Sequence, residues 1–131
     1  MNNFIFELID VRKLKPHEHV DPLNVKSVYD SIVRTGAWLE PIIIDRETNT
    51  IMDGHHRYEA ARKLNLDKIP CYTACYSSND ISIVSWKTGE AINHIDILEA
   101  AESGKLLPIK STRHLICTHL PSSKLNLDSL I

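Results

Sequence analysis

The residues with the clearest capacity for chemistry stand together as Asp53-Gly54-His55-His56-Arg57. The segment follows a predicted strand and opens a predicted helix, an arrangement that presents backbone N–H groups and the positive end of a helix dipole to an anion. Gly54 has no Cβ to keep a phosphate away, and Arg57 offers a planar fork for phosphate oxygens. Asp53 supplies the hard oxygen that Mg²⁺ prefers, directly or through a water. The pattern favours a phosphate site, although a capped strand–turn–helix with surface histidines has the same five letters.

The elements that must position this segment follow from apolar spacing and turn residues. Three consecutive isoleucines at 42–44 indicate a strand that is buried on both faces, and Gly36 and Gly104 are typical helix stops. The first helix should place Val25, Val28, Tyr29, Ile32 and Val33 on one face. We expect strands at 4–11, 41–45, 51–52, 66–72, 81–86 and 115–119, and helices at 23–35, 55–64 and 94–103.

Length and composition set the class of protein. The chain of 131 residues predicts a single domain over residues 1–131, with 118–131 as a loosely ordered tail. A net charge of −2 disfavours nucleic acid as a partner. No apolar run approaches a membrane span, and Met1-Asn2-Asn3 does not start a secretion signal, so we expect a cytoplasmic protein. The cysteines at 71, 75 and 117 have no repeated spacing and fit ordinary reduced thiols.

The segment Asp53-Gly54-His55-His56-Arg57-Tyr58-x-Ala60, entered from the hairpin at 41–52, resembles the ParB/sulfiredoxin superfamily. ParB proteins carry Gly-Glu-Arg-Arg there and sulfiredoxins Gly-Cys-His-Arg, whereas Asp-Gly-His-His-Arg is similar to the free serine kinases of the superfamily. The resemblance implies an α+β fold, a compact ParB/sulfiredoxin-like domain in which helices pack on a small mixed sheet. It also implies an enzyme that phosphorylates free L-serine, with ADP or ATP as donor and Mg²⁺ as cofactor, and releases O-phospho-L-serine.

The same resemblance assigns roles around the donor and the reacting hydroxyl. Leu14-Lys15-Pro16-His17-Glu18 is similar to the family's early loop, whose glutamate is the catalytic base, and this implies that role for Glu18. A serine hydroxyl is a poor nucleophile at neutral pH, so a carboxylate that takes its proton makes physical sense. The residues implied to hold the nucleotide phosphates are Asp53, Gly54, His55, His56 and Arg57, with Asp53 also catalytic through Mg²⁺.

The serine end of the implied site comes from later in the chain. The stretch 104–114 resembles the family's late loop, which implies that Thr112, Arg113 and His114 bind the substrate serine, and Trp86 matches a tryptophan of the substrate pocket. The resemblance thus runs from Val11 to about His114 in the family's order. Only 25 residues separate Trp86 from Thr112, fewer than in the family, which fits a minimal enzyme or a sensor that keeps the binding loops.

Other functions stay open at this point. A ParB-like regulatory module would bind a nucleotide and a DNA or protein partner without kinase activity, but the chain lacks a clear helix-turn-helix. Sulfiredoxin-like repair needs a cysteine where this chain has His55. A metal protein would draw on His17, His19, His55 and His56, whose spacing fixes no ligand set; His17 and His19 are typical surface residues. Oligomeric state and the choice between ADP and ATP do not follow from the sequence.

Overall fold

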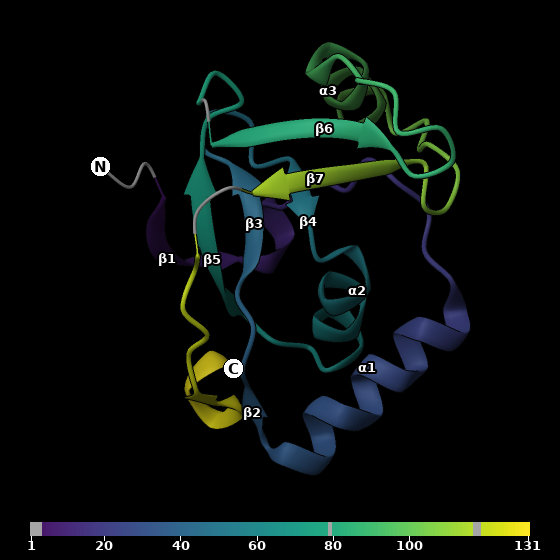
Figure 1. Ribbon diagram of the computed structural model, residues 1–131. Coiled ribbons are helices and arrows are strands. Elements are labelled where there is room, and N and C mark those ends of the chain that lie inside the picture. Colours follow the sequence, from purple (N-terminus) through teal and green to yellow (C-terminus); the bar gives the residue numbers. More distant parts are fainter. Residues whose placement is uncertain (1–3, 79, 117–118) are drawn as a thin grey trace.

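A computed structural model describes residues 4–78, 80–116 and 119–131, so part of the strand predicted at 115–119 lies outside the described residues, as does Cys117. The helices and strands follow the predicted order, and the predicted α+β fold is confirmed (Figure 1). The strands are β1 Ile5–Asp10, β2 Ala37–Trp38, β3 Ile42–Asp45, β4 Ile51–Asp53, β5 Lys68–Ala74, β6 Ile81–Ser85, β7 Thr112–Ile116 and β8 Leu125–Asn126. The helices are α1 Pro22–Thr35, α2 His55–Lys63 and α3 His94–Ser103, with short 3-10 turns η1 at Val11–Lys13 and η2 at Leu127–Leu130.

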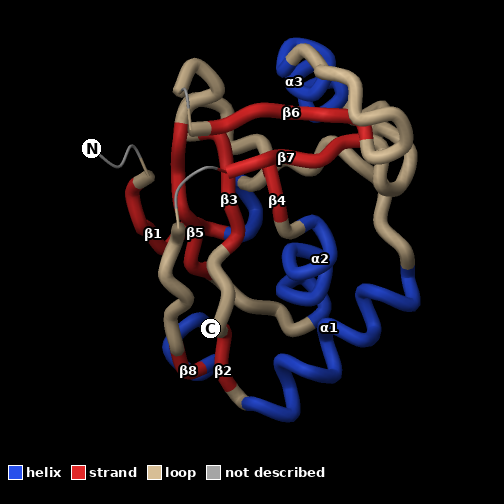
Figure 2. Tube along the Cα trace, in the orientation of Figure 1, coloured by secondary structure: helices blue, strands red, loops and turns tan. Residues whose placement is uncertain are grey.

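The main sheet has the strand order β1-β5-β3-β4 and is mixed. β3 and β4 form an antiparallel hairpin, and β1 lies antiparallel to β5 at the opposite edge. β3 and β5 are parallel because the chain passes through β4 and α2 before it returns to the sheet. This crossover brings the end of β4 and the start of α2 next to β3, as Figure 2 shows.

The isoleucines of β3 join the two cores of the protein. Ile42 and Ile44 belong to the core that includes α2, whereas Ile43 belongs to a second core that includes Ile81 of β6. The antiparallel ribbon of β6 and β7 thus packs over the sheet on the side away from α2 (Figure 2). All four residues of β3 are buried, so the prediction of a strand that is apolar on both faces is confirmed.

Helix α1 begins and ends at clear signals but is less buried than its apolar pattern predicts. The Asp21 carboxylate accepts from the Leu23 N–H at 3.0 Å, and Gly36 ends the helix in the left-handed region. Val25 is 2% exposed, whereas Val33 is 49% exposed. Val28 and Ile32 are only partly buried because they line a cavity, whereas Val33 lies outside the cavity and faces solvent.

Helix α3 has the predicted bounds, and its Asn93 side chain accepts from the N–H of Ile95 at 3.0 Å as an N-cap. Gly104 ends it in the left-handed region. Within the described residues, no helix has both the length and the apolar character needed to cross a membrane.

The C-terminal stretch differs from the loosely ordered tail that the sequence suggests. β8 pairs with β2 in antiparallel register, and the N–H of Asp67 donates to the carbonyl of Leu130 at 2.7 Å. Leu130 is 1% exposed and belongs to the core that includes α2. The stretch is ordered because its alternating leucines cover that core beside Trp38.

Candidate functional site

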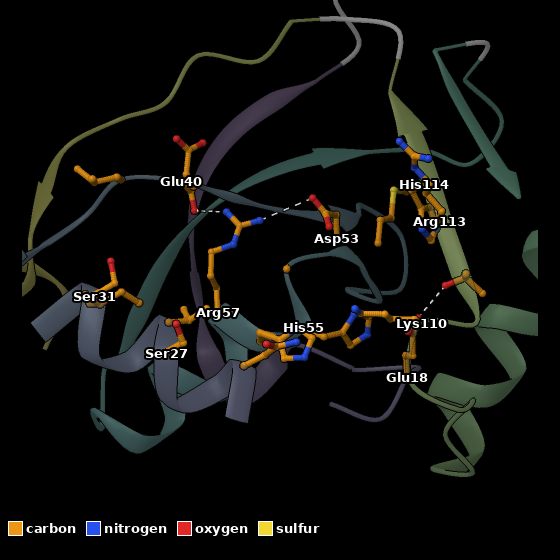
Figure 3. Close-up of a pocket in the computed structure, with 18 of the residues that line it drawn as sticks. Glu18, Ser27, Ser31, Glu40, Asp53, His55, Arg57, Lys110, Arg113 and His114 are labelled. Atoms are coloured by element: carbon orange, nitrogen blue, oxygen red, sulfur yellow. Dashed lines mark hydrogen bonds and ion pairs between the residues drawn. The ribbon is translucent and has the colours of Figure 1, made fainter. Parts of the chain in front are cut away.

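A cavity of about 830 Å³ lies between α1, the start of α2, the end of β4 and β7 (Figure 3). Its lining includes all ten residues that the sequence marks as site residues: Glu18, Asp53, Gly54, His55, His56, Arg57, Trp86, Thr112, Arg113 and His114. The structure therefore brings the early loop, the strand–helix turn and the late segment to one place. Thr112, Arg113 and His114 lie on strand β7 rather than in the expected loop, because this segment pairs with β6.

Residues 15–19 are fixed on both sides by backbone hydrogen bonds. The N–H of Lys15 donates to Asn49 and its carbonyl accepts from Ile51, both at 2.9 Å. On the other side, the His17 carbonyl accepts from the Leu107 N–H at 2.8 Å, and the His19 N–H donates to the Leu107 carbonyl at 2.9 Å. This segment connects the β3–β4 hairpin to the stretch before β7, and it holds Glu18 in the cavity wall.

Glu18 is the best-held carboxylate of the cavity. Its Oε2 accepts from the hydroxyl of Thr112 at 2.9 Å, and its Oε1 accepts from the N–H of Ser111 at 3.2 Å. The side chain is only 11% exposed. Burial raises the pKa of Glu18 above its usual range, and the hydrogen bond from Thr112 counteracts part of that rise. A carboxylate of this kind is suited to accept a proton.

His17 is a functional candidate that sequence reasoning missed. The prediction of a surface residue is wrong, because His17 is fully buried behind Glu18. Its Nδ1–H donates to the carbonyl of Ile51 at 2.7 Å, and its Nε2 lies 3.0 Å from the Thr112 hydroxyl. Burial lowers the pKa of His17 to about 4, so the ring is neutral near pH 7. The residues next to His17 are mostly polar and show no helical or strand periodicity, so the sequence does not indicate that His17 is buried.

The turn before α2 requires glycine for packing. Gly54 has a φ of 111°, and a Cβ at this position would lie 2.5 Å from Cγ2 of Ile42. The turn therefore lies directly on β3, and it places the start of α2, with the N–H groups of its first turn, at the cavity. No side chain among the described residues caps these groups at Gly54, so they can serve as anion ligands.

The imidazoles of His55 and His56 bind the protein's own backbone. Nε2 of His55 accepts from the N–H of His17, and Nε2 of His56 accepts from the N–H of Asp21, both at 3.1 Å. Burial lowers the pKa of both histidines, and His55 is the more strongly affected. Because Nε2 of each ring accepts, the proton of each neutral imidazole lies on Nδ1, so the Nδ1–H groups as well as the backbone N–H groups can donate to a phosphate.

Arg57 and Asp53 flank the start of α2. One nitrogen of Arg57 donates to the carbonyls of Glu40 and Pro41, at 2.6 Å and 3.1 Å. Its other terminal nitrogen lies 3.6 Å from the Asp53 carboxylate, whose side chain is 62% exposed (Figure 3). The guanidinium is thus held in one orientation at the cavity wall, while the Asp53 carboxylate faces open space.

The β6–β7 end of the cavity carries the serine-site candidates. The guanidinium of Arg113 stacks over the indole of Trp86 at 4.7 Å, and the indole is half exposed. Nε2 of His114 is hydrogen-bonded to the Tyr76 hydroxyl at 2.9 Å, while its buried Nδ1 has no partner among the described residues. Burial lowers the pKa of His114 to about 3.

Sequence reasoning also missed a row of polar side chains on α1. Asn24, Ser27, Ser31 and Thr35 line the cavity, and Figure 3 shows Ser27 and Ser31 on the side away from Glu18, Arg113 and His114. Their spacing of four residues within a predicted helix is the signal that places them on one face.

A metal site built from histidines finds no support in the described part of the chain. Within residues 4–78, 80–116 and 119–131, no three histidine, cysteine or carboxylate side chains are grouped to hold an ion. A single exposed carboxylate such as Asp53 suits Mg²⁺, which uses one or two protein carboxylates together with substrate phosphates.

Comparisons with known proteins agree with this geometry. The profile of the ParB N-terminal domain matches residues 3–86. A "ParB-like protein" of Sulfolobus acidocaldarius is 36% identical over 66% of this chain and 43% of its own length. An "ATP-dependent L-serine kinase" of Desulfurococcus mucosus is 34% identical over 72% of this chain and 38% of its own. The chain thus spans about two fifths of the length of these relatives.

A solved structure described as a free serine kinase in complex with AMP superposes with a TM-score of 0.86. The match covers 98% of this chain and 94% of that chain at 14% sequence identity. At this identity the likeness is one of fold.

Proposed function

Because this chain belongs to the ParB N-terminal domain family, we propose that it transfers a phosphoryl group from ADP or ATP to the hydroxyl of free L-serine and forms O-phospho-L-serine. The observation that carries the proposal is the placement of Glu18: a mostly buried carboxylate, held by Ser111 and Thr112, in the cavity that also contains the start of α2. The D. mucosus relative is named for this reaction.

The donor phosphates are best placed at the start of α2. The free N–H groups of the first turn and the helix dipole attract the phosphate oxygens. Arg57 adds a positive charge whose position is fixed by two backbone carbonyls, so it stabilises developing negative charge without having to reorganise. Asp53 would hold Mg²⁺, which supplies charge neutralisation on the phosphates when bound.

The acceptor is best placed at the β7 wall. The guanidinium of Arg113, stacked on Trp86, suits the carboxylate of a free amino acid. Thr112 and His114 line the same wall; Thr112 would act through its hydrogen bond to Glu18, and His114 would contact the ligand with the carbon edge of its ring, because Tyr76 occupies its Nε2. Glu18 then accepts the hydroxyl proton as the serine oxygen attacks the terminal phosphoryl group. Most of the rate enhancement comes from positioning and electrostatics.

The size of the cavity is compatible with both ligands. A volume of about 830 Å³ lies within the roughly 300–1,000 Å³ of typical small-molecule pockets. The polar side chains of α1 supply further hydroxyl groups to the cavity wall.

A second candidate is a regulatory module that binds the nucleotide without phosphorylating serine. It is favoured by the S. acidocaldarius relative, which is named only as ParB-like, and by the limited share of each relative that this chain spans. The two functions differ in whether serine is consumed.

The test is to incubate the protein with Mg²⁺, L-serine and either ADP or ATP and to detect O-phosphoserine by mass spectrometry. Glu18→Ala should reduce the product by orders of magnitude, whereas Glu47→Ala, at an exposed turn position, should not. Nucleotide binding by a folded protein without any O-phosphoserine would favour the regulatory module instead.

A further inference from the structure

The fully buried His17 has a hydrogen-bond arrangement that the proposed reaction leaves unexplained. The Ile51 carbonyl can only accept, so Nδ1 of His17 must carry its proton. In a neutral ring, Nε2 is then a bare acceptor, and it faces the Thr112 hydroxyl at 3.0 Å.

The hydroxyl of Thr112 has one proton for two acceptors. It lies 2.9 Å from Oε2 of Glu18 and 3.0 Å from Nε2 of His17. When Glu18 is a carboxylate, the charged oxygen is the stronger acceptor, so the hydroxyl donates to Glu18. Nε2 of His17 is then buried against an oxygen lone pair without a proton between them, which is unfavourable.

Protonation of Glu18 removes this conflict. Oε2–H of Glu18 then donates to Oγ1 of Thr112, and the Thr112 hydroxyl turns to donate to Nε2 of His17. Both short contacts are then hydrogen bonds, and Glu18, Thr112 and His17 are all neutral. Glu18, Thr112 and His17 form a chain of three groups, which we call the proton row. Before the reaction the row has one proton for two contacts, and after Glu18 is protonated each contact has its own proton.

We propose that His17 is a positioning residue for the reaction: it acts through the hydroxyl of Thr112, which turns from Glu18 to His17 when Glu18 takes up the substrate proton. The inference rests on the proposed function. The serine O–H bond breaks and its proton moves to Oε2 of Glu18. The electron pair stays on the serine oxygen, which forms the new O–P bond, and the nucleotide leaves with the electrons of the old one.

The charged and titratable groups around the row do not compete for this proton. His55 of α2 and His114 of β7 lie with ring centroids 4.5 Å and 5.8 Å from His17, and burial lowers the pKa of both. They stay neutral and disfavour a charged His17. Lys110 lines the same cavity and is exposed. The proton therefore stays on Glu18. His17 responds to it only because the Thr112 hydroxyl then donates to Nε2 of His17.

The direct test needs neither serine nor nucleotide. Long-range ¹H–¹⁵N NMR of the histidines should show His17 as the neutral Nδ1–H form, with an Nε2 resonance that moves as Glu18 titrates, because the Thr112 hydroxyl turns toward it. In Glu18→Gln that movement should vanish. A His17 Nε2 resonance that ignores Glu18, or a ring that becomes doubly protonated in step with it, would overturn the proposal.

Kinetic variants give an independent readout. His17→Phe removes the acceptor, so Thr112 always serves the carboxylate, and the acidic limb of the kcat profile should move to lower pH. Thr112→Val removes the donor to the carboxylate and should move the limb to higher pH. His17→Gln, which keeps an acceptor near Thr112, should stay close to the wild type. Shifts of the same sign in His17→Phe and Thr112→Val would refute the proton row.

The two proposals fail separately. The NMR signature without any O-phosphoserine would leave the proton row intact and remove the kinase function. O-phosphoserine formation with a His17 resonance that does not respond to Glu18 would support the kinase function and refute the proton row.

Discussion

Replacement of Leu130 by alanine should destabilise the protein strongly, although the residue is next to last in the sequence. Leu130 is 1% exposed and packs in the core that includes Trp38 and α2. Truncation removes three buried carbon atoms, at about 0.8 kcal/mol each, and leaves a cavity. We expect a loss of about 2–5 kcal/mol in the free energy of unfolding, a large part of the ~5–15 kcal/mol typical of a domain.

Urea unfolding followed by tryptophan fluorescence, to which the buried Trp38 contributes, measures this loss. Ile131→Ala is the matched control, because Ile131 is 72% exposed and its truncation should cost less than about 0.5 kcal/mol. A Leu130→Ala variant as stable as the control would refute the conclusion that the C-terminal stretch completes the core.

Three further predictions concern the site. Gly54→Ala should cost about 2 kcal/mol or more, because the new methyl overlaps Ile42 and φ is positive; thermal unfolding at wild-type stability would contradict the packing account. Arg113→Lys should raise the KM for serine about tenfold or more with a smaller effect on kcat, since lysine offers no planar fork; an unchanged KM would remove Arg113 from the serine site. The pKa values of His17 and His114, about 4 and 3, lie below the usual 6.5, so the unfolded chain binds more protons below about pH 6.5 and stability should fall as pH drops toward 4. The raised pKa of Glu18 opposes part of this fall, and a urea midpoint that rises on acidification would be inconsistent with buried neutral histidines.

Local patterns were sufficient for most of the fold. The isoleucines of β3, the caps Asp21 and Asn93 and the stops Gly36 and Gly104 act within a few residues of their own position, and the structure follows them. The C-terminal stretch contains alternating leucines, which are compatible with a strand. Whether they form one depends on pairing with Ala37–Trp38, which is distant in sequence.

The sequence named residues that the structure brings together in one cavity, but it did not predict the hydrogen bonds among them. The resemblance marked Glu18 and the turn at Gly54, and the structure places both in one cavity. Nothing near His17 indicates that two distant segments, the β3–β4 hairpin and the stretch before β7, bury its ring. The hydrogen bonds from the His17 and Asp21 N–H groups to the rings of His55 and His56 were equally unpredictable, because these N–H groups come from a distant part of the chain.

The measurement that tests the central claim most directly is the stoichiometry of one reaction. Protein, Mg²⁺ and L-serine are incubated with ATP, and in parallel with ADP, and both O-phosphoserine and the nucleotide product are quantified over time. A serine kinase forms the two products in equal amounts, consumes no nucleotide without serine, and loses both products in Glu18→Gln while still binding nucleotide. Nucleotide consumption that is independent of serine, or bound nucleotide with no O-phosphoserine from the intact Glu18 protein, would contradict the account.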